Sequence, residues 1–115
     1  MYFSKDGEFH RVVRVTGPAH NILGLSFSRR KPEEVAVIKL RDAPAATIDE
    51  SRLRQAIFSG VTAANAEFGC EYLVDRIQYD PSDTPDLDVY AALARTLVER
   101  VHHETRAATP VGGQR

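Results

Sequence analysis

The apolar residues near the start of the chain follow a period of two. In the segment 9–16, Val13 and Val15 fall on one face, and Arg14 and Thr16 fall on the other. This alternation is typical of a β-strand with one face buried, and valine favours the extended conformation. We therefore predict a first strand over these residues.

A second strand is predicted after a short break. Leu23, Leu25 and Phe27 alternate with small residues, so this strand presents three large apolar groups to the core. The segment 17–21, Gly-Pro-Ala-His-Asn, is rich in turn-forming residues. We expect it to be the loop that joins the two strands as an antiparallel pair. The apolar run 35–40 predicts a third strand.

Helical spacing begins near residue 50. Thr47 and Glu50 have the spacing of a capping box, in which the threonine oxygen accepts a hydrogen bond from a free amide of the first turn. Gly69 is suited to the left-handed conformation that ends a helix. The apolar residues between them are three or four apart and share one side of a helix: Leu53, Ile57, Val61, Ala64 and Phe68.

The segment after this helix predicts a fourth strand over residues 71–79. Leu73 and Ile77 share one face, and Tyr72 and Val74 share the other. Both faces of this predicted strand therefore carry apolar residues.

The junction that follows is the most clearly marked part of the chain. Pro81 restricts the residue before it to extended conformations, so the strand must end there. Thr84 can accept hydrogen bonds from the free amides of a helix whose first residue is Pro85. We expect a second helix from this point, with an apolar stripe formed by Leu87, Tyr90, Ala94, Leu97 and Val101.

These elements follow the order β-β-β-α-β-α. Each predicted helix has one apolar stripe to bury, and a four-stranded sheet with both helices on one face buries both stripes. We therefore predict an α+β two-layer sandwich, formed by a single domain over residues 1–107, with a disordered tail over 108–115.

The composition excludes several classes of protein. With 115 residues, 43% hydrophobic and 27% charged, the chain has the size and balance of one soluble globular domain. Its one cysteine, Cys70, cannot form an internal disulfide, and no Cys/His cluster resembles a zinc site. We find neither the apolar run of a signal peptide nor the roughly twenty apolar residues of a membrane span. We expect a cytoplasmic protein that contacts no membrane and holds no metal or cofactor.

The net charge of −1 is unevenly distributed along the chain. Residues 1–41 carry eight Lys or Arg and four Asp or Glu, whereas residues 42–115 carry seven and twelve. This difference fits a basic surface that meets a partner, and it also fits charges that solvate separate surfaces. The charge distribution therefore leaves both readings open.

Three segments, in this order, resemble segments of a known family. They are Ile-Leu-Gly-Leu-Ser at 22–26, Ala-Ile-Phe-Ser-Gly-Val at 56–61 and Tyr-Asp-Pro-Ser-Asp-Thr-Pro at 79–85. They resemble a glycine-centred strand, a first helix and a Tyr-Ser-Pro-Val-Ser-Thr-Pro loop in domain IV of elongation factor G and of the tetracycline ribosomal-protection proteins. The resemblance covers most of residues 12–103. It implies the ribosomal-protein domain-2-like fold, with a left-handed βαβ crossover.

In that family, two loops at one end of domain IV enter the decoding centre of the small ribosomal subunit. The resemblance implies that the matching loops here, 17–21 and 79–84, contact a ribosome, a structured RNA or a protein partner. The chain has no G-x-x-x-x-G-K-[ST] motif, so it is not a translocase by itself. The candidate binding residues are Pro18, His20, Asn21, Tyr79, Asp80, Pro81, Ser82 and Asp83.

Charged residues change this picture in two ways. A basic patch would bind phosphate groups, although basic residues in turns are also commonly solvated. Asp80 and Asp83 place two carboxylates in a predicted tip loop, where phosphate contact favours neutral or basic groups. The candidates for the basic patch are Arg14, Arg29, Arg30 and Lys31.

No catalytic constellation is visible in the sequence. Ser59 and Gly60 lie inside a predicted helix rather than at a nucleophile elbow. His102 and His103 lack the i, i+4 spacing that places two metal ligands on one helix face. The sequence favours a binding module over an enzyme. The alternative is a small accessory protein or enzyme that has a small-molecule pocket on the same fold.

With both helices on one side, the other face of the predicted sheet is expected to be open. We expect Val12, Tyr72 and Val74 on this open face, where they are apolar enough for a second copy of the chain to cover them. The sequence therefore predicts a homodimer.

Overall fold

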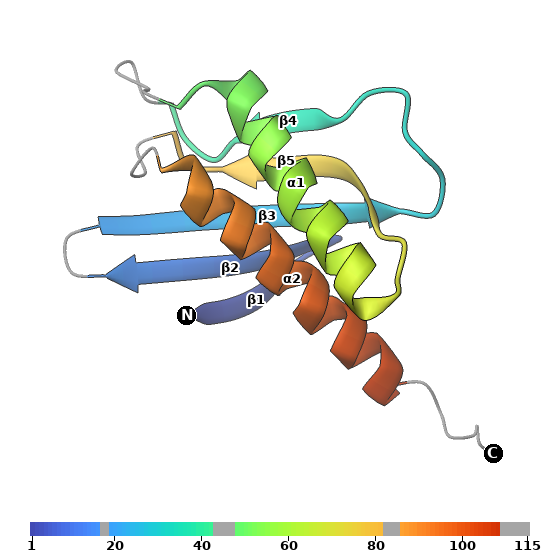
Figure 1. Cartoon of the computed structure of the whole chain (residues 1–115). Helices are drawn as coiled ribbons and strands as arrows, with labels where there is room; N and C mark the ends of the chain where they lie inside the picture. Colours follow the sequence, from blue (N-terminus) through green and yellow to red (C-terminus); the bar gives the residue numbers. More distant parts are fainter. Residues whose placement is uncertain (17–18, 43–47, 82–85, 109–115) are drawn as a thin grey trace.

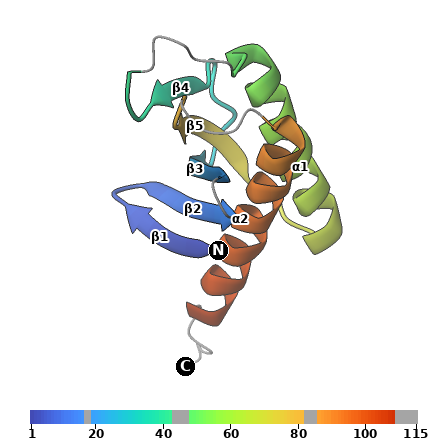
Figure 2. The same ribbon diagram turned by 90° about the vertical axis from the view of Figure 1, so that its left-hand side faces the viewer.

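The computed structural model of the chain describes residues 1–16, 19–42, 48–81 and 86–108. In this part of the chain, five strands form one mixed sheet, and two helices cover one of its faces (Figure 1 and Figure 2). The predicted α+β class is confirmed, whereas the prediction of four strands is wrong. The elements are β1 (Tyr2–Asp6), β2 (Phe9–Thr16), β3 (Ala19–Ser28), β4 (Ala36–Lys39), α1 (Glu50–Phe68), β5 (Leu73–Tyr79) and α2 (Leu87–Ala108).

β1 is the strand that the sequence pattern missed. It pairs antiparallel with β2, and the pairing of Asp6 with Phe9 leaves only Gly7 and Glu8 in the turn. Gly7 has a φ of 60°, the left-handed conformation that two-residue hairpin turns require. In β1 only Phe3 packs against the core. An edge strand of this kind shows no apolar alternation, which is why it could not be recognised.

The hairpin between β2 and β3 is tighter than predicted. Thr16 pairs with Ala19, so the loop predicted over 17–21 is wrong, and His20 and Asn21 belong to β3. A five-residue loop would have placed Val15 opposite Leu23. The shorter loop changes the register by an odd number of residues, and a shift of that kind exchanges the two faces of a strand.

The exchange decides which valine of β2 is buried. Val12 lies opposite Leu23 and has no exposed surface, whereas Val15 is 56% exposed on the opposite face. Cross-strand partners share a face, so the side chain opposite Leu23 must point toward the helices.

In β5, a β-bulge also changes which side chains share a face. Ser26 pairs with Arg76 and Phe27 with Val74, so Asp75 is the extra residue. Because of this residue, Val74 and Ile77 both belong to the core, and Tyr72 packs against it. The open apolar face predicted from Val12, Tyr72 and Val74 is therefore wrong. The homodimer stays a prediction, without the surface from which it was argued.

The strands lie in the order β1-β2-β3-β5-β4. All neighbours are antiparallel except β4 and β5, which are parallel and connected through α1. In Figure 1, both of these strands run toward the left, α1 lies in front of the sheet, and the chain steps from the upper strand β4 to the lower strand β5. Figure 2 gives the same arrangement from the side. This connection is left-handed, whereas almost all βαβ connections are right-handed.

The helices bury most of the stripes that were predicted, and Phe68 and Leu87 are half-buried against the core. Leu53, Ile57, Val61 and Ala64 of α1 are buried, and α1 ends at Gly69 in the left-handed conformation, with a φ of 65°. Gly60 is also buried because α1 and α2 approach closely there. A Cβ at Gly60 would collide with the carbonyl oxygen of Ala91 and lie 3.2 Å from the Cβ of Ala94. The buried residues of α2 include Tyr90, Ala94, Leu97 and Val101.

Both helices begin later than predicted. Asp49 caps α1, because its Oδ1 accepts hydrogen bonds from the backbone amides of Ser51 and Arg52 at 2.9 and 3.2 Å. The predicted caps Thr47 and Thr84 lie outside the described residues. α2 continues to Ala108, and the rest of the predicted tail also lies outside them. Within the described residues, neither helix is both long enough and apolar enough to cross a membrane.

Candidate functional site

The described residues of the two segments that the resemblance singled out, 19–21 and 79–81, lie at one end of the sheet. We call this the tip end; there β2, β4 and β5 end, β3 begins, and both helices start (Figure 1). Asn21 pairs with Arg14, and Leu23, two residues further along β3, pairs with Tyr79. His20 and Asn21 therefore lie on the strand next to Tyr79, Asp80 and Pro81. Pro18, Ser82 and Asp83 lie outside the described residues.

The described candidates differ in how accessible they are. His20 is half-buried, whereas Asn21, Tyr79, Asp80 and Pro81 are buried. Side chains with almost no exposed surface cannot contact a ligand unless the surrounding structure moves. Among the described candidates, His20 is thus the one that offers surface to a partner.

Tyr79 connects the sheet to α1. Its phenolic hydroxyl donates a hydrogen bond of 2.8 Å to Oε2 of Glu50, the first residue of the helix. Burial, followed by the hydrogen bond and the negative charge of Glu50, raises the pKa of Tyr79 above its ordinary value of 10.0. The phenol therefore stays protonated and acts as a fixed donor that holds the start of α1 against the end of β5.

Asp80 is paired within the protein. Its Oδ2 lies 2.9 Å from Nε of Arg41, and the carboxylate is 1% exposed whereas the Arg41 side chain is 62% exposed. A buried carboxylate requires such a partner, because burying an unpaired charge is costly. Its charge is balanced inside the molecule, and the outward-facing member of the pair is the cation. The expected repulsion between Asp80 and phosphate is therefore largely removed.

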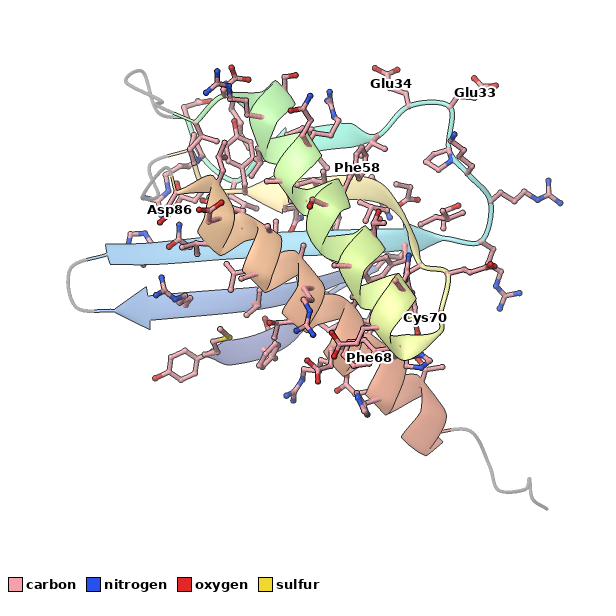
Figure 3. All side chains as sticks on the ribbon, viewed as in Figure 1. Glu33, Glu34, Phe58, Phe68, Cys70 and Asp86 are labelled. Carbon is pink, nitrogen blue, oxygen red and sulfur yellow. The ribbon has the colours of Figure 1, made fainter. Side chains whose placement is uncertain are left out.

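The helix starts at this end are already capped by the chain's own carboxylates. Asp49 caps α1, and Oδ1 of Asp86 accepts a hydrogen bond of 3.1 Å from the backbone amide of Asp88 at the start of α2 (Figure 3). Helix N-termini attract anions when their amides are available. Here these carboxylates occupy amides that could otherwise bind a phosphate.

The basic residues do not form one patch. Arg14 lies at the tip end, opposite Asn21. Arg29, Arg30 and Lys31 follow the other end of β3. β3 spans Ala19–Ser28, so at about 3.3 Å per residue its two ends are roughly 30 Å apart. The single basic patch predicted from these four residues is wrong, because the length of one strand separates its members.

Residues that were considered for metal binding or catalysis have structural contacts instead. The thiol of Cys70 lies 3.3 Å from Oδ1 of Asn65, and burial raises its pKa. The rings of His102 and His103 pack edge-on against Tyr72 and Phe68. Within the described ranges, no group of three or more His, Cys, Asp or Glu side chains could hold a metal ion.

Two grooves were missed by the sequence analysis. The first, which we call the hairpin groove, lies between the β1–β2 hairpin and the C-terminal half of α2 and has a volume of about 470 Å³. The second, the loop groove, has a volume of about 400 Å³ and lies between the β3–β4 connection, α1 and β5, near Phe58 and Glu33 (Figure 3). Each is built from segments far apart in the chain, so no local pattern could reveal it.

Comparisons with known proteins give no assignment. No family model matches the chain, and neither a curated protein nor a solved structure matches it.

Proposed function

We propose that the protein is a binding module that contacts structured RNA, with the small ribosomal subunit as the first candidate, through its tip end. The observation that carries the proposal is the left-handed connection through β4, α1 and β5 (Figure 1 and Figure 2). This connection is rare, and it is the one that the resemblance to translation-factor domain IV implies. The same resemblance assigns RNA contact to the end of the sheet at which His20 and Tyr79 lie.

The exposed arginines at the tip end support this proposal. Arg14 and Arg41 are partly and largely exposed there, and His20, on the strand next to Arg14, is half-buried. The pairing with Arg41 neutralises the buried carboxylate of Asp80. Arg41 is balanced by Asp80, and Asp49 and Asp86 add carboxylates at the same end, so the cation that we propose for contact with a phosphate backbone is Arg14.

Binding of the full chain to purified small ribosomal subunits and to a structured rRNA fragment, at low and high salt, tests the proposal. We expect binding that weakens as salt rises. Arg14→Gln should reduce the affinity and lower the salt slope by about one unit, as expected for one lost phosphate contact. Arg30→Gln is the matched control, because Arg30 is exposed at the opposite end of β3.

Two results would contradict the proposal. One is the absence of salt-sensitive binding to either RNA. The other is a loss of affinity in Arg30→Gln that equals or exceeds the loss in Arg14→Gln, because it would place the contact at the other end of the molecule.

A different observation favours the second candidate function, small-molecule binding on the same fold. The hairpin groove lies between the sheet and a helix, and its volume of about 470 Å³ falls within the range of ligand sites in proteins. Neither His20 nor Asp80 lines it. This candidate can therefore be tested separately from the RNA-binding one.

A further inference from the structure

The hairpin groove has an apolar floor. Phe3 from β1 and Leu97 and Val101 from α2 form this floor. Leu97 and Val101 belong to the buried core, and Phe3 packs against it, so the floor is fixed by the fold. In Figure 2, the β1–β2 hairpin and the lower half of α2 lie next to each other near the N-terminus. An apolar floor of this kind accommodates a hydrocarbon or aromatic group.

The rim of the groove is mainly basic. Lys5 and His10 lie opposite each other on β1 and β2, and Arg100 comes from α2. We call these three residues the basic rim. The acidic group among the residues that line the groove is Glu104. Arg11 also lines the groove, but its guanidinium is bound to Asp6 and Gln78. The two other permanent cations and a titratable histidine thus face one carboxylate, so the groove has an excess of positive charge when empty.

This excess is only partly compensated inside the protein. Nε of Arg100 lies 3.8 Å from Oε2 of Glu104, and the guanidinium lies over the ring of Phe3, 4.2 Å from its centroid. A guanidinium has five N–H donors, so this contact leaves others available. Among the described residues, no carboxylate forms an ion pair with Lys5.

The pKa of His10 depends first on burial and then on the charges of the groove. Burial, followed by the positive charge of Lys5, lowers the pKa of His10 below its ordinary value of 6.5, and Glu104 opposes this change. Its ring also packs beside Phe27 of β3, with 5.8 Å between the ring centroids. An anion placed among these groups would stabilise the protonated ring and add to its attraction for Lys5 and Arg100.

We propose that the hairpin groove binds a small amphipathic carboxylate, with its hydrocarbon part on the apolar floor and its carboxylate at the basic rim. The floor matches the hydrocarbon part, and the positive excess of the rim matches the anionic head. The volume of about 470 Å³ suits a molecule of the size of a medium-chain fatty acid. This site is independent of the tip end and of RNA binding.

Decanoate, with decan-1-ol and acetate as matched probes, tests the proposal by NMR titration of the full chain. Decanol keeps the hydrocarbon part without the charge, and acetate keeps the charge without the hydrocarbon part. We expect decanoate to shift the amide signals of Phe3, His10 and Leu97 and to bind at least about tenfold more tightly than either control. Lys5→Gln should weaken decanoate binding about fivefold, the usual scale of one partly exposed ion pair. Lys39→Gln, on the far edge of the sheet, should leave it unchanged.

The pKa of His10 provides an independent readout. A bound carboxylate raises it, whereas a bound alcohol removes water without adding charge and lowers it further. The proposal is overturned if decanol binds as tightly as decanoate, if decanoate leaves or lowers the pKa of His10, or if Lys39→Gln weakens binding as much as Lys5→Gln. It is also overturned if the shifted amides surround the loop groove instead.

Discussion

The two faces of the sheet are shielded from water in different ways. The face toward the helices is covered by apolar side chains of α1 and α2, which pack against Val12, Leu23 and Ile77. The open face is covered in part by its own long polar side chains. Nη2 of Arg11 donates to Oδ2 of Asp6 at 3.0 Å and to Oε1 of Gln78 at 2.9 Å. A sheet without a second helical layer can thus shield its strands with a network of hydrogen-bonded side chains.

Arg76 belongs to the same network of side chains. Its guanidinium lies 4.8 Å from the centroid of the Phe9 ring and 3.3 Å from a carboxylate oxygen of Glu8, and its Nε donates to Oγ of Ser26 at 3.0 Å. Ser26 also donates to Asp75, the bulge residue. Phe9 and Ser26 are buried on this face although no helix covers them. On the open face, residues are buried by flexible polar side chains. On the other face, they are buried by the apolar side chains of two packed helices.

The strongest test of this difference is on the helix side. Gly60→Ala should destabilise the protein by about 3 kcal/mol, because the new methyl group meets the backbone carbonyl of Ala91, which cannot rotate away. Urea unfolding measures the change. Ser59→Ala, at the exposed neighbouring position, should alter the free energy of unfolding by less than about 0.5 kcal/mol. Equal effects of the two substitutions would show that α1 and α2 are not in close contact.

Threonine substitutions at two valines of β2, one on each face, compare the contribution of the two faces to stability. Val12→Thr places a hydroxyl among apolar residues and should cost about 2 kcal/mol, whereas Val15→Thr should cost less than about 0.5 kcal/mol because Val15 is exposed. Urea unfolding of both variants checks this. The reverse order would mean that the register with the five-residue loop is the true one.

On the open face, a similar glycine should be easier to replace. A Cβ at Gly24 would lie 2.6 Å from Oε1 of Gln78, and this oxygen can move, although moving it disturbs the bond from Arg11. We expect Gly24→Ala to cost about 1 kcal/mol. In a Gln78→Ala background the cost should be roughly half as large, because the amide is gone while the Cβ of residue 78 remains close. An unchanged cost in that background would show that the clash involves the backbone.

The smallest expected effect is a pH dependence from His10. Its pKa is lowered in the folded protein, first by burial and then by Lys5, so the unfolded chain binds more protons than the folded one below about pH 6.5. Stability should therefore fall as the pH decreases through this region and level off below the folded pKa. Urea unfolding at pH 7.5 and 5.5 measures the loss, which should be smaller in His10→Gln. A larger loss in the variant would assign the effect to other groups.

The helices were the part of the fold that local patterns could predict. The spacing of Leu53, Ile57, Val61 and Ala64 defines a stripe within one element, and all four are buried. Gly69 ends α1 as expected, because the left-handed conformation is a property of the residue itself. Helix starts were less certain, since several residues able to cap stand close together, and Asp49 rather than Thr47 has that role.

The faces of the strands could not be predicted from the same kind of pattern. Phe9, Val12, Val13 and Val15 give β2 apolar residues on both sides, and only the pairing of Val12 with Leu23 decides between them. The bulge at Asp75 depends on the match between β3 and β5, which are far apart in the chain. An error of one residue in register is enough to reverse a face.

The candidate site was predictable only in outline. The resemblance implied that the segments containing His20 and Tyr79 lie at one end of the molecule, and they do. It could not indicate that Asp80 is buried against Arg41, or that Arg14 lies about one strand length from Arg30. The two grooves depend entirely on how separate elements pack.

The sequence by itself therefore determined the α+β class, both helical stripes and the ends of several elements, because these depend on spacing and backbone preference within a few residues. The tertiary structure alone decided which face of β2 and β5 is buried, how the charge of Asp80 is balanced, and where the grooves lie. These features depend on register, on the left-handed connection and on contacts between distant segments. The interactions that stabilise these features join residues that are far apart in the sequence, so no local stretch contains both partners.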